Sequence, residues 1–201
     1  MIELTVEQIS SAVQGSVIGD GTVVITGSVE TDSRLVKPGS LFVAKPGEVT
    51  DGHNFAGKAQ ESGAVALLVE RVLDDVSIPQ ILVEDSVVAL GLLAKFVLAE
   101  IRKQTGVQVI GVTGSNGKTT TKNMLRQVLS EIGETIAPIE SYNNEVGAPY
   151  SILQTNLNTK FLVVELGAGG PGSIDYLAQI AKQWHARRTR LQFRADQIML
   201  I

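Results

Sequence analysis

The stretch "GVTGSNGKTTTK", residues 111–122, decides the fold of this chain. It follows the apolar run 107–110 and leads into a segment for which we predict a helix over residues 118–132. A strand that ends in a glycine-rich turn and continues into a helix directs backbone N–H groups and the positive end of the helix dipole into one small volume. The stretch therefore predicts a polyphosphate site.

Each residue type in this turn suits phosphate binding. Gly114 and Gly117 permit a close approach that a Cβ would block, Lys118 can place its charge between β- and γ-phosphates, and Thr119 can offer its hydroxyl to Mg²⁺. The usual string begins with a further glycine, and here that position is Val112. The alternative is a glycine-rich turn with an incidental lysine. The predicted ATP-binding residues are Gly114, Ser115, Asn116, Gly117, Lys118, Thr119 and Thr120.

The segments around the turn predict a parallel sheet. We expect strands over 107–112, 135–137 and 161–166, with a loop between the last two. The alternation of strands with helices is typical of parallel strands joined by crossovers. Glu165 then lies at the carboxyl end of a core strand, where α/β sheets bind ligands. Its carboxylate is a candidate Mg²⁺ ligand and catalytic group together with Lys118. A solvated acid at a strand end is the alternative.

The first half of the chain predicts a second α/β unit. Thr5 and Gln8 form a capping-box pattern for a short helix that Gly15 would end. Short β-rich runs occupy 23–25, 41–44, 65–69 and 81–83, with a helix over 54–62 and a long one over 86–104. We therefore predict an N-terminal domain over 1–84, a linker helix over 85–106, a partial central domain over 107–181 and an atypical tail over 182–201.

Composition excludes several classes of function. A net charge of −4 and a pI near 5.2 argue against a broad surface for nucleic acid or anionic membrane. Without cysteine no disulfide framework can form, which predicts a reducing, cytoplasmic location. The apolar segment 87–101 is interrupted by Lys95 and Glu100 and is too short to span a membrane comfortably. Two histidines make a histidine-based metal site implausible.

Longer stretches resemble a known family. Residues 113–120, "SYNNEVGAP" at 141–149 and "VVELGA" at 163–168 resemble the central ATP-binding domain of the Mur ligases. The segment 31–70 resembles the uridine-nucleotide-binding domain of the same family, and the resemblance extends to Ala181. It implies an N-terminal uridine-nucleotide-binding α/β domain followed by an incomplete P-loop-type parallel-sheet domain.

The resemblance implies an ATP-dependent, amide-bond-forming ligase of peptidoglycan precursor synthesis. The loop 143–147 is most similar to the member that joins D-alanyl-D-alanine to UDP-N-acetylmuramoyl-tripeptide through an acyl-phosphate. The sister enzyme that adds the third amino acid is the alternative. ATP and Mg²⁺ are the implied cofactors, with Thr119 and Glu165 near the metal and Lys118 at the phosphates.

Substrate contacts are implied by the same resemblance. Ser33 and Arg34 would touch the uridine nucleotide, His53 would belong to a nucleotide-binding loop, and Asn143 and Asn144 would face substrate or phosphates. Ordinary structural roles compete with each assignment. Paired asparagines suit turns, a lone loop histidine often serves local hydrogen bonds, and Arg34 could be a simple surface charge. Asp32 is expected to cap or brace the turn that carries Ser33 and Arg34.

The amino-acid composition changes after Ala181, where the C-terminal tail of residues 182–201 begins. Residues 182–201 carry five basic side chains against Asp196 alone, a net charge of +4, where the family pattern calls for another apolar parallel strand. We interpret this as a frameshift or truncation and expect an exposed sheet edge and no ligation by this chain. A non-catalytic fragment that binds ATP or a UDP-sugar is then an alternative. An unrelated P-loop kinase would leave 31–70 unexplained.

Overall fold

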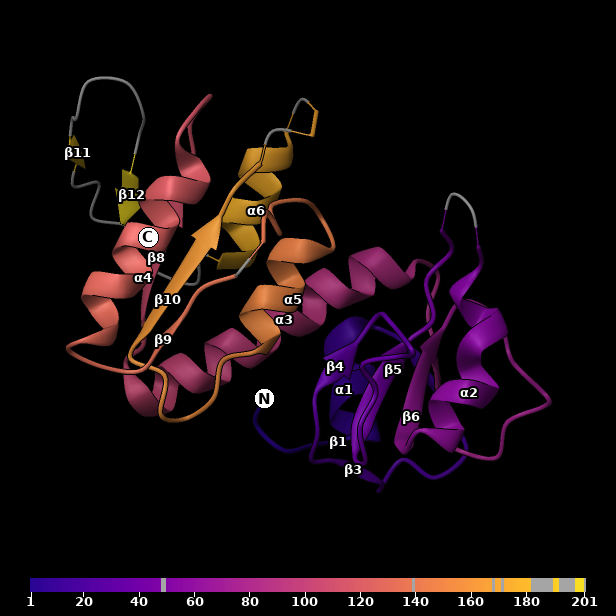
Figure 1. Ribbon diagram of the computed structural model, residues 1–201. Coiled ribbons are helices and arrows are strands. Elements are labelled where there is room, and N and C mark those ends of the chain that lie inside the picture. The colour runs from indigo at the N-terminus through magenta and orange to yellow at the C-terminus, as the bar shows by residue number, and fades with distance from the viewer. Residues whose placement is uncertain are drawn as a thin grey trace. The chain divides into compact units, whose positions relative to one another are not determined.

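The computed structural model describes residues 1–47, 50–138, 140–167, 169–170, 172–181, 190–191 and 198–200 (Figure 1). The chain divides into two compact units, Met1–Leu93 and Ala94–Ile201. Helix α3, Ser86–Thr105, begins in the first unit and ends in the second. Each unit is an α/β structure with its own parallel strands, as the sequence predicted. In the described ranges no helix has the length and apolar character needed to cross a membrane.

The first unit is built on a five-stranded sheet of order β2-β7-β6-β5-β4. Neighbouring strands are parallel except for the antiparallel pair of β2 and β7, and β1 and β3 form a separate antiparallel pair. Its elements are β1 Leu4–Thr5, α1 Val6–Val13, β2 Ser16–Ile18, β3 Val24–Ile25, β4 Val29–Glu30, β5 Ser40–Val43, η1 Gly52–Phe55, α2 Ala56–Glu61, β6 Ala64–Val69 and β7 Gln80–Leu82.

The capping box at the start of α1 forms as the sequence predicted. The Thr5 hydroxyl accepts the N–H of Gln8 at 3.1 Å, and the Gln8 side chain accepts the N–H of Thr5 at 2.9 Å. Two of the N–H groups that an isolated helix start leaves without partners are therefore satisfied. The predicted stop at Gly15 is wrong by one residue, since Gln14 adopts the left-handed conformation at φ 59°.

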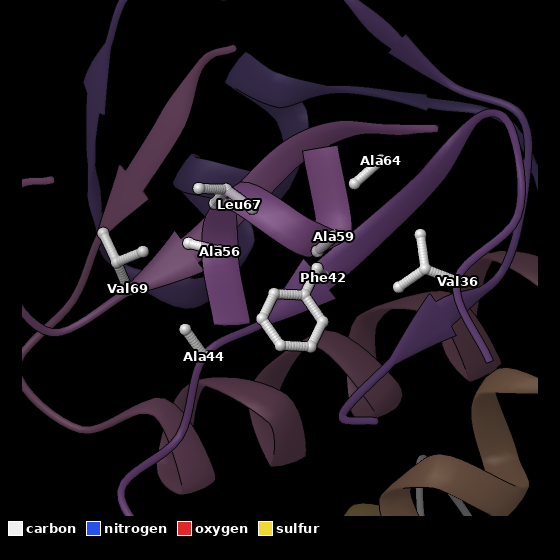
Figure 2. Packing of buried hydrophobic residues seen from close by; sticks show 8 residues of the cluster. All are labelled: Val36, Phe42, Ala44, Ala56, Ala59, Ala64, Leu67 and Val69. Carbon is white, nitrogen blue, oxygen red and sulfur yellow. The ribbon is translucent and has the colours of Figure 1, made fainter. Parts of the chain in front are cut away.

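A hydrophobic core lies between β5, β6 and α2 (Figure 2). Phe42 pairs with Leu67 in the parallel register, and side chains two residues apart share a face of a strand. Ala56 and Ala59 of α2 pack against this face. The small alanine side chains let the helix lie close to the sheet. The cluster comprises Val36, Phe42, Ala44, Ala56, Ala59, Ala64, Leu67 and Val69.

The second unit has a sheet of order β11-β12-β8-β10-β9. Strands β8, β10 and β9 are parallel, as predicted, whereas β12 runs antiparallel to β8. Strand β8 is therefore not an edge of the sheet, because β12 pairs with it, and the edge strands are β11 and β9. The remaining elements are β8 Gln108–Val112, α4 Lys118–Ser130, β9 Thr135–Ile136, α5 Gly147–Leu153, β10 Phe161–Glu165, α6 Ser173–Ala181, β11 Arg190–Leu191 and β12 Ile198–Leu200.

One helix of this unit, α5, lies where the sequence predicted a loop. It begins at Gly147 and contains Pro149, two residues that usually oppose helices. Pro149 lies in the first turn, where a missing N–H costs no intrahelical hydrogen bond. Ile152 and Leu153 are buried, so packing stabilises the helix against the poor propensity of its start.

The strand register determines which side chains face α4. Val163 pairs with Ile110 and Glu165 pairs with Val112, so these four residues share one face of the sheet. Ile110, Val112 and Val163 form a core cluster against which Leu125 and Leu129 of α4 pack. Glu165, two residues after Val163, therefore projects from the carboxyl end of β10 on the α4 side.

Candidate functional site

The glycine-rich turn joins β8 to α4 and forms the floor of the candidate site. Gly117 precedes the helix with φ 79°, a left-handed conformation that glycine adopts without a Cβ penalty. The first N–H groups of α4 have no partner within the helix and point out of its start. Val112, where the usual motif has glycine, is the last residue of β8 and is buried in the core. The turn therefore begins at Thr113, one residue after the position of the usual first glycine, and no glycine is needed at Val112.

Lys118 and Thr119 lie at the opening of this turn. Lys118 Nζ donates to the carbonyl oxygen of Gly114 at 2.7 Å, so its charge lies over the turn. Thr119 Oγ1 lies 3.2 Å from the hydroxyl oxygen of Ser141 and 3.2 Å from Glu165 Oε2. The other predicted turn residues, Ser115, Asn116 and Thr120, are exposed.

Glu165 is the buried centre of the site, with 1% of its surface exposed. Its Oε1 accepts a hydrogen bond from Asn143 Nδ2 at 2.9 Å, and its Oε2 accepts one from Thr119 Oγ1. The alternative that Glu165 is a solvated acid at a strand end is therefore excluded. The structure brings together three predicted residues, namely Thr119, Asn143 and Glu165, around the end of β10, while Lys118 lies over the neighbouring turn.

Lys122 belongs to the same cluster and was not predicted. Its side chain is fully buried, its Nζ donates to the carbonyl oxygen of Glu140 at 3.0 Å, and it lies 3.7 Å from Glu165 Oε2. Burial lowers the pKa of Lys122, while the Glu165 carboxylate acts in the opposite direction. The available signal was its position four residues after Lys118, one turn further along the same helix face.

The two neighbouring asparagines have different environments. Asn143 contacts Glu165 through its side chain, and its carbonyl oxygen accepts the N–H of Gly167 at 2.8 Å. The side chain of Asn144 instead accepts the N–H groups of Val146 and Gly147, which lead into α5. Asn144 therefore has the turn role that we weighed as its alternative, and a contact of Asn144 with substrate stays a prediction.

The oxygen atoms at the end of β10 fit a magnesium ion. Thr119 and Glu165 supply a hydroxyl and a carboxylate within 3.2 Å of one another. Among the residues that the structure describes, no group of three or more His, Cys, Asp or Glu side chains could hold a metal alone. Mg²⁺ commonly keeps several waters and binds one or two protein oxygens together with phosphate oxygens. The donor set suits a metal that arrives with a nucleotide.

A cavity of about 480 Å³ lies beside this cluster and does not include the glycine-rich turn. Glu140 and Tyr142, which flank Ser141 in the sequence, line it together with Arg126, Tyr150 and Gln154. A phosphate bound at the glycine-rich turn would therefore lie outside this cavity.

In the first unit, Ser33 and Arg34 lie in the turn after β4. Ser33 is buried, with 7% of its surface exposed, whereas the Arg34 side chain is 78% exposed. Arg34 holds the Asp32 carboxylate through two side-chain nitrogens and its backbone N–H. These hydrogen bonds lower the pKa of Asp32 to about 2. Asp32 braces the turn as we expected, and nucleotide contacts of Ser33 and Arg34 stay predictions.

His53 lies in the 3-10 helix η1 and is buried, with 4% of its surface exposed. Its Nε2 accepts the N–H of Glu70 at 2.9 Å, which requires the proton on Nδ1. Nδ1 then donates to Asp51 Oδ1 at 2.6 Å. Both ring nitrogens are therefore engaged within the unit, and a substrate-binding role for His53 stays a prediction.

Two family models match the chain. The model of the Mur ligase family catalytic domain matches residues 26–97, which include Ser33, Arg34 and His53, and the Mur ligase middle domain matches residues 112–191. The chain belongs to the Mur ligase family. The middle-domain match of this Mur ligase chain runs to residue 191, ten residues past Ala181.

Named relatives of this Mur ligase chain are UDP-N-acetylmuramoyl-tripeptide–D-alanyl-D-alanine ligases. That of Mycobacterium leprae is 39% identical and that of Escherichia coli K12 37%, each over 90% of this chain. A crystal structure of MurF from Acinetobacter baumannii matches 90% of the chain with a TM-score of 0.80 and 34% identity. The MurF ligase of Thermotoga maritima in complex with ADP matches 78% with a TM-score of 0.66 and 37% identity. The chain spans 36–40% of the length of these four proteins.

Proposed function

We propose that this chain binds ATP with Mg²⁺ at the turn before α4 and binds UDP-N-acetylmuramoyl-tripeptide through its N-terminal unit. The proposed reaction is that of an ATP-dependent ligase, which joins D-alanyl-D-alanine to the tripeptide in peptidoglycan precursor synthesis. The observation that carries the proposal is the contact of Thr119 with the buried Glu165 beside the glycine-rich turn. The names of the relatives support the choice of substrates.

The proposed chemistry has two steps. A carboxylate oxygen of the tripeptide attacks the γ-phosphorus of ATP, the bond to the β-phosphate oxygen breaks, and ADP leaves. The amine of D-alanyl-D-alanine then attacks the acyl carbon, phosphate leaves, and the amine loses its proton as the amide bond forms. The first step brings two anions together, which requires fixed positive groups at the phosphates.

The residues of the turn match that requirement. Lys118 would neutralise charge on the transferring phosphoryl group, and the N–H groups at the start of α4 would bind phosphate oxygens without reorganisation. Thr119 and Glu165 would hold Mg²⁺, which would supply further charge neutralisation when bound. Asn143 would fix the orientation of the Glu165 carboxylate through its hydrogen bond.

Recognition of the uridine nucleotide is proposed for residues 1–84, with the helix over 85–106 as a linker. The exposed guanidinium of Arg34 is a suitable donor for a diphosphate, because its planar fork can bind two oxygens at once. His53 would act indirectly, by holding its loop against Glu70 through the Nε2 hydrogen bond. The central domain is proposed for residues 107–181.

Thermal unfolding of the purified chain tests both binding functions. A ligand that binds only the folded state at 100 times its dissociation constant stabilises it by about 2.7 kcal/mol. Mg²⁺-ATP and UDP-N-acetylmuramoyl-tripeptide are each expected to raise the unfolding midpoint, whereas D-alanyl-D-alanine alone is a negative control. A chain protected by ATP alone would contradict the proposal that the N-terminal unit binds UDP-N-acetylmuramoyl-tripeptide.

An assay of ligation separates catalysis from binding alone. The 201-residue chain is incubated with UDP-N-acetylmuramoyl-tripeptide, D-alanyl-D-alanine and Mg²⁺-ATP, and ADP and the pentapeptide product are measured. Binding of both ligands without product would favour the alternative of a non-catalytic fragment. Product with another amine, and none with D-alanyl-D-alanine, would favour the sister ligase.

A further inference from the structure

Lys122 is an unusual lysine because its whole side chain lies inside the second unit. Lysine is almost never fully buried unless it is paired, since its charge loses hydration. The nearest carboxylate is that of Glu165, which is itself 1% exposed. A buried ion pair of this kind is weak evidence for stability, because desolvation offsets most of the attraction. Its position beside the candidate metal ligand suggests a different role.

The distances show that Lys122 attracts the Glu165 carboxylate by charge alone and forms no hydrogen bond with its oxygens. The Nζ atom donates a hydrogen bond to the carbonyl oxygen of Glu140 at 3.0 Å, but it lies 3.7 Å from Glu165 Oε2, beyond hydrogen-bonding range. The same Oε2 lies 3.2 Å from Thr119 Oγ1. The charge of Lys122 thus attracts the Glu165 carboxylate toward α4, and its Oε2 still accepts the hydrogen bond of Thr119.

Lys122 also connects two segments that build the site. Its hydrogen bond fixes the backbone at Glu140, and the next residue, Ser141, contacts the hydroxyl of Thr119. One buried ammonium therefore joins α4, the segment before α5 and the end of β10. All three meet at the two oxygens proposed to hold Mg²⁺.

We infer that Lys122 is a positioning residue for the metal: it orients the Glu165 carboxylate toward Thr119, and its hydrogen bond to Glu140 anchors the ammonium in place. Lys122 touches neither the nucleotide nor the metal in this account. The inference rests on the proposed function, since it needs a Mg²⁺-nucleotide complex at the turn. It assigns the metal-dependent part of nucleotide binding to a side chain outside the glycine-rich motif.

The test separates metal affinity from nucleotide affinity in the full 201-residue chain. ADP binding is measured by calorimetry in EDTA and then at increasing Mg²⁺ concentrations. In Lys122→Met the Mg²⁺ concentration for half-maximal enhancement of ADP binding is expected to rise about 10- to 100-fold, the usual effect of losing an outer partner of a metal ligand. The ADP affinity in EDTA is expected to stay unchanged, which a general loss of structure would not allow.

A matched control comes from the same helix. Arg126 lies one turn beyond Lys122 and is exposed, so Arg126→Met removes a cation of α4 without touching Glu165. This variant is expected to keep the wild-type dependence on Mg²⁺. A similar loss in both variants would overturn the inference, because general electrostatics of the helix would then explain the result.

A second pair of variants keeps the inference testable if Lys122→Met fails to fold. Lys122→Met combined with Glu165→Gln leaves no unpaired buried charge and is compared with Glu165→Gln alone. Because Lys122 acts through Glu165, the two chains are expected to show the same Mg²⁺ dependence. A further loss in the double variant would contradict the inference.

The remaining outcomes are also decisive. An unchanged half-maximal Mg²⁺ concentration in Lys122→Met would overturn the inference. A lower half-maximal Mg²⁺ concentration would also overturn it and would show that the ammonium competes with the metal. Wild-type chain that binds ADP equally with and without Mg²⁺ would do the same. Wild-type chain that binds no nucleotide would overturn the proposed function, and this inference with it.

Discussion

In the second unit several side chains meet at the Glu165 carboxylate at the end of β10, whereas in the first unit Arg34 and His53 are each engaged with a close neighbour. Thr119, Asn143 and Lys122 come from three segments and all surround Glu165. Arg34 pairs with Asp32 two residues earlier, and His53 is held by Asp51 and the backbone of Glu70. Convergence of polar groups on one buried carboxylate indicates a binding site, while local pairing by itself indicates a stable loop.

Two glycines in left-handed conformations give the largest expected effects and separate the two units. Gly117→Ala, at φ 79°, is expected to cost about 1–2 kcal/mol of stability and to abolish measurable Mg²⁺-ADP binding, because the phosphate turn must shift. Gly63→Ala, at φ 101° with its Cβ 2.8 Å from Pro38 Cα, is expected to cost more than about 2 kcal/mol and to leave ADP affinity unchanged. Chemical denaturation and calorimetry measure both. Equal ADP affinities in the two variants would break the comparison.

His53 is expected to contribute to the stability of the fold and not to contact the ligand directly. His53→Ala leaves the partly buried N–H of Glu70 without its acceptor, which is expected to cost about 1–3 kcal/mol in the free energy of unfolding. Arg71→Ala, which removes only the exposed ion pair with Asp51, serves as control and is expected to cost under about 1 kcal/mol. If His53→Ala unfolds like wild type yet loses affinity for UDP, then His53 is a direct ligand and the first unit resembles the second more than we propose.

The adjacent asparagines sharpen the comparison within a single loop. Asn144→Ala is expected to cost about 1 kcal/mol of stability through loss of its hydrogen bonds at the start of α5, with little change in ADP affinity. Asn143→Ala is expected to weaken Mg²⁺-dependent ADP binding, since the Glu165 carboxylate loses a donor. Denaturation and calorimetry on both variants decide the assignment, and the reverse pattern would show that the two roles are exchanged.

Asp32 gives the smallest expected effect, and it depends on pH. Hydrogen bonds from Arg34 lower the pKa of Asp32 to about 2 in the folded chain, below the ordinary value of about 3.9. The contribution to stability is therefore complete above about pH 4 and is lost as the pH falls toward 2. Asp32→Asn is expected to be slightly less stable than wild type at pH 7 and equal to it near pH 2. A difference that persists at pH 2 would show that Asp32 stabilises its turn by other means.

Much of the fold follows from the sequence because its signals are local. The capping box at Thr5, the apolar face of α3 and the strand-turn-helix around Gly117 depend on residues close in sequence, and the structure confirms them. Strand β12, which pairs with β8, was not predicted because its pairing depends on a distant partner. Helix α5 was missed because Pro149 opposes helices everywhere except in the first turn, and its position relative to that turn depends on the preceding loop.

The site was predictable only in part, for the same reason. Glu165 could be placed at the α4 side because strand alternation fixes the face of every second residue. The burial of Lys122 could not be predicted, since the helical pattern alone assigns a lysine to solvent unless a distant carboxylate is known to face it. The strand, turn and helix at the site could therefore be predicted from the sequence, whereas the burial of Lys122 beside Glu165 could be found only from the tertiary structure.

Calorimetric titration with Mg²⁺-ADP of the wild-type chain and of Lys118→Ala tests the central claim most directly. Lys118 has a half-buried side chain over the turn and no partner in the core cluster of α4, so the variant is expected to unfold at the wild-type midpoint. Wild type is expected to bind one nucleotide, and Lys118→Ala is expected to bind at least about 100-fold more weakly. A folded Lys118→Ala chain with wild-type affinity would contradict a phosphate site at this turn.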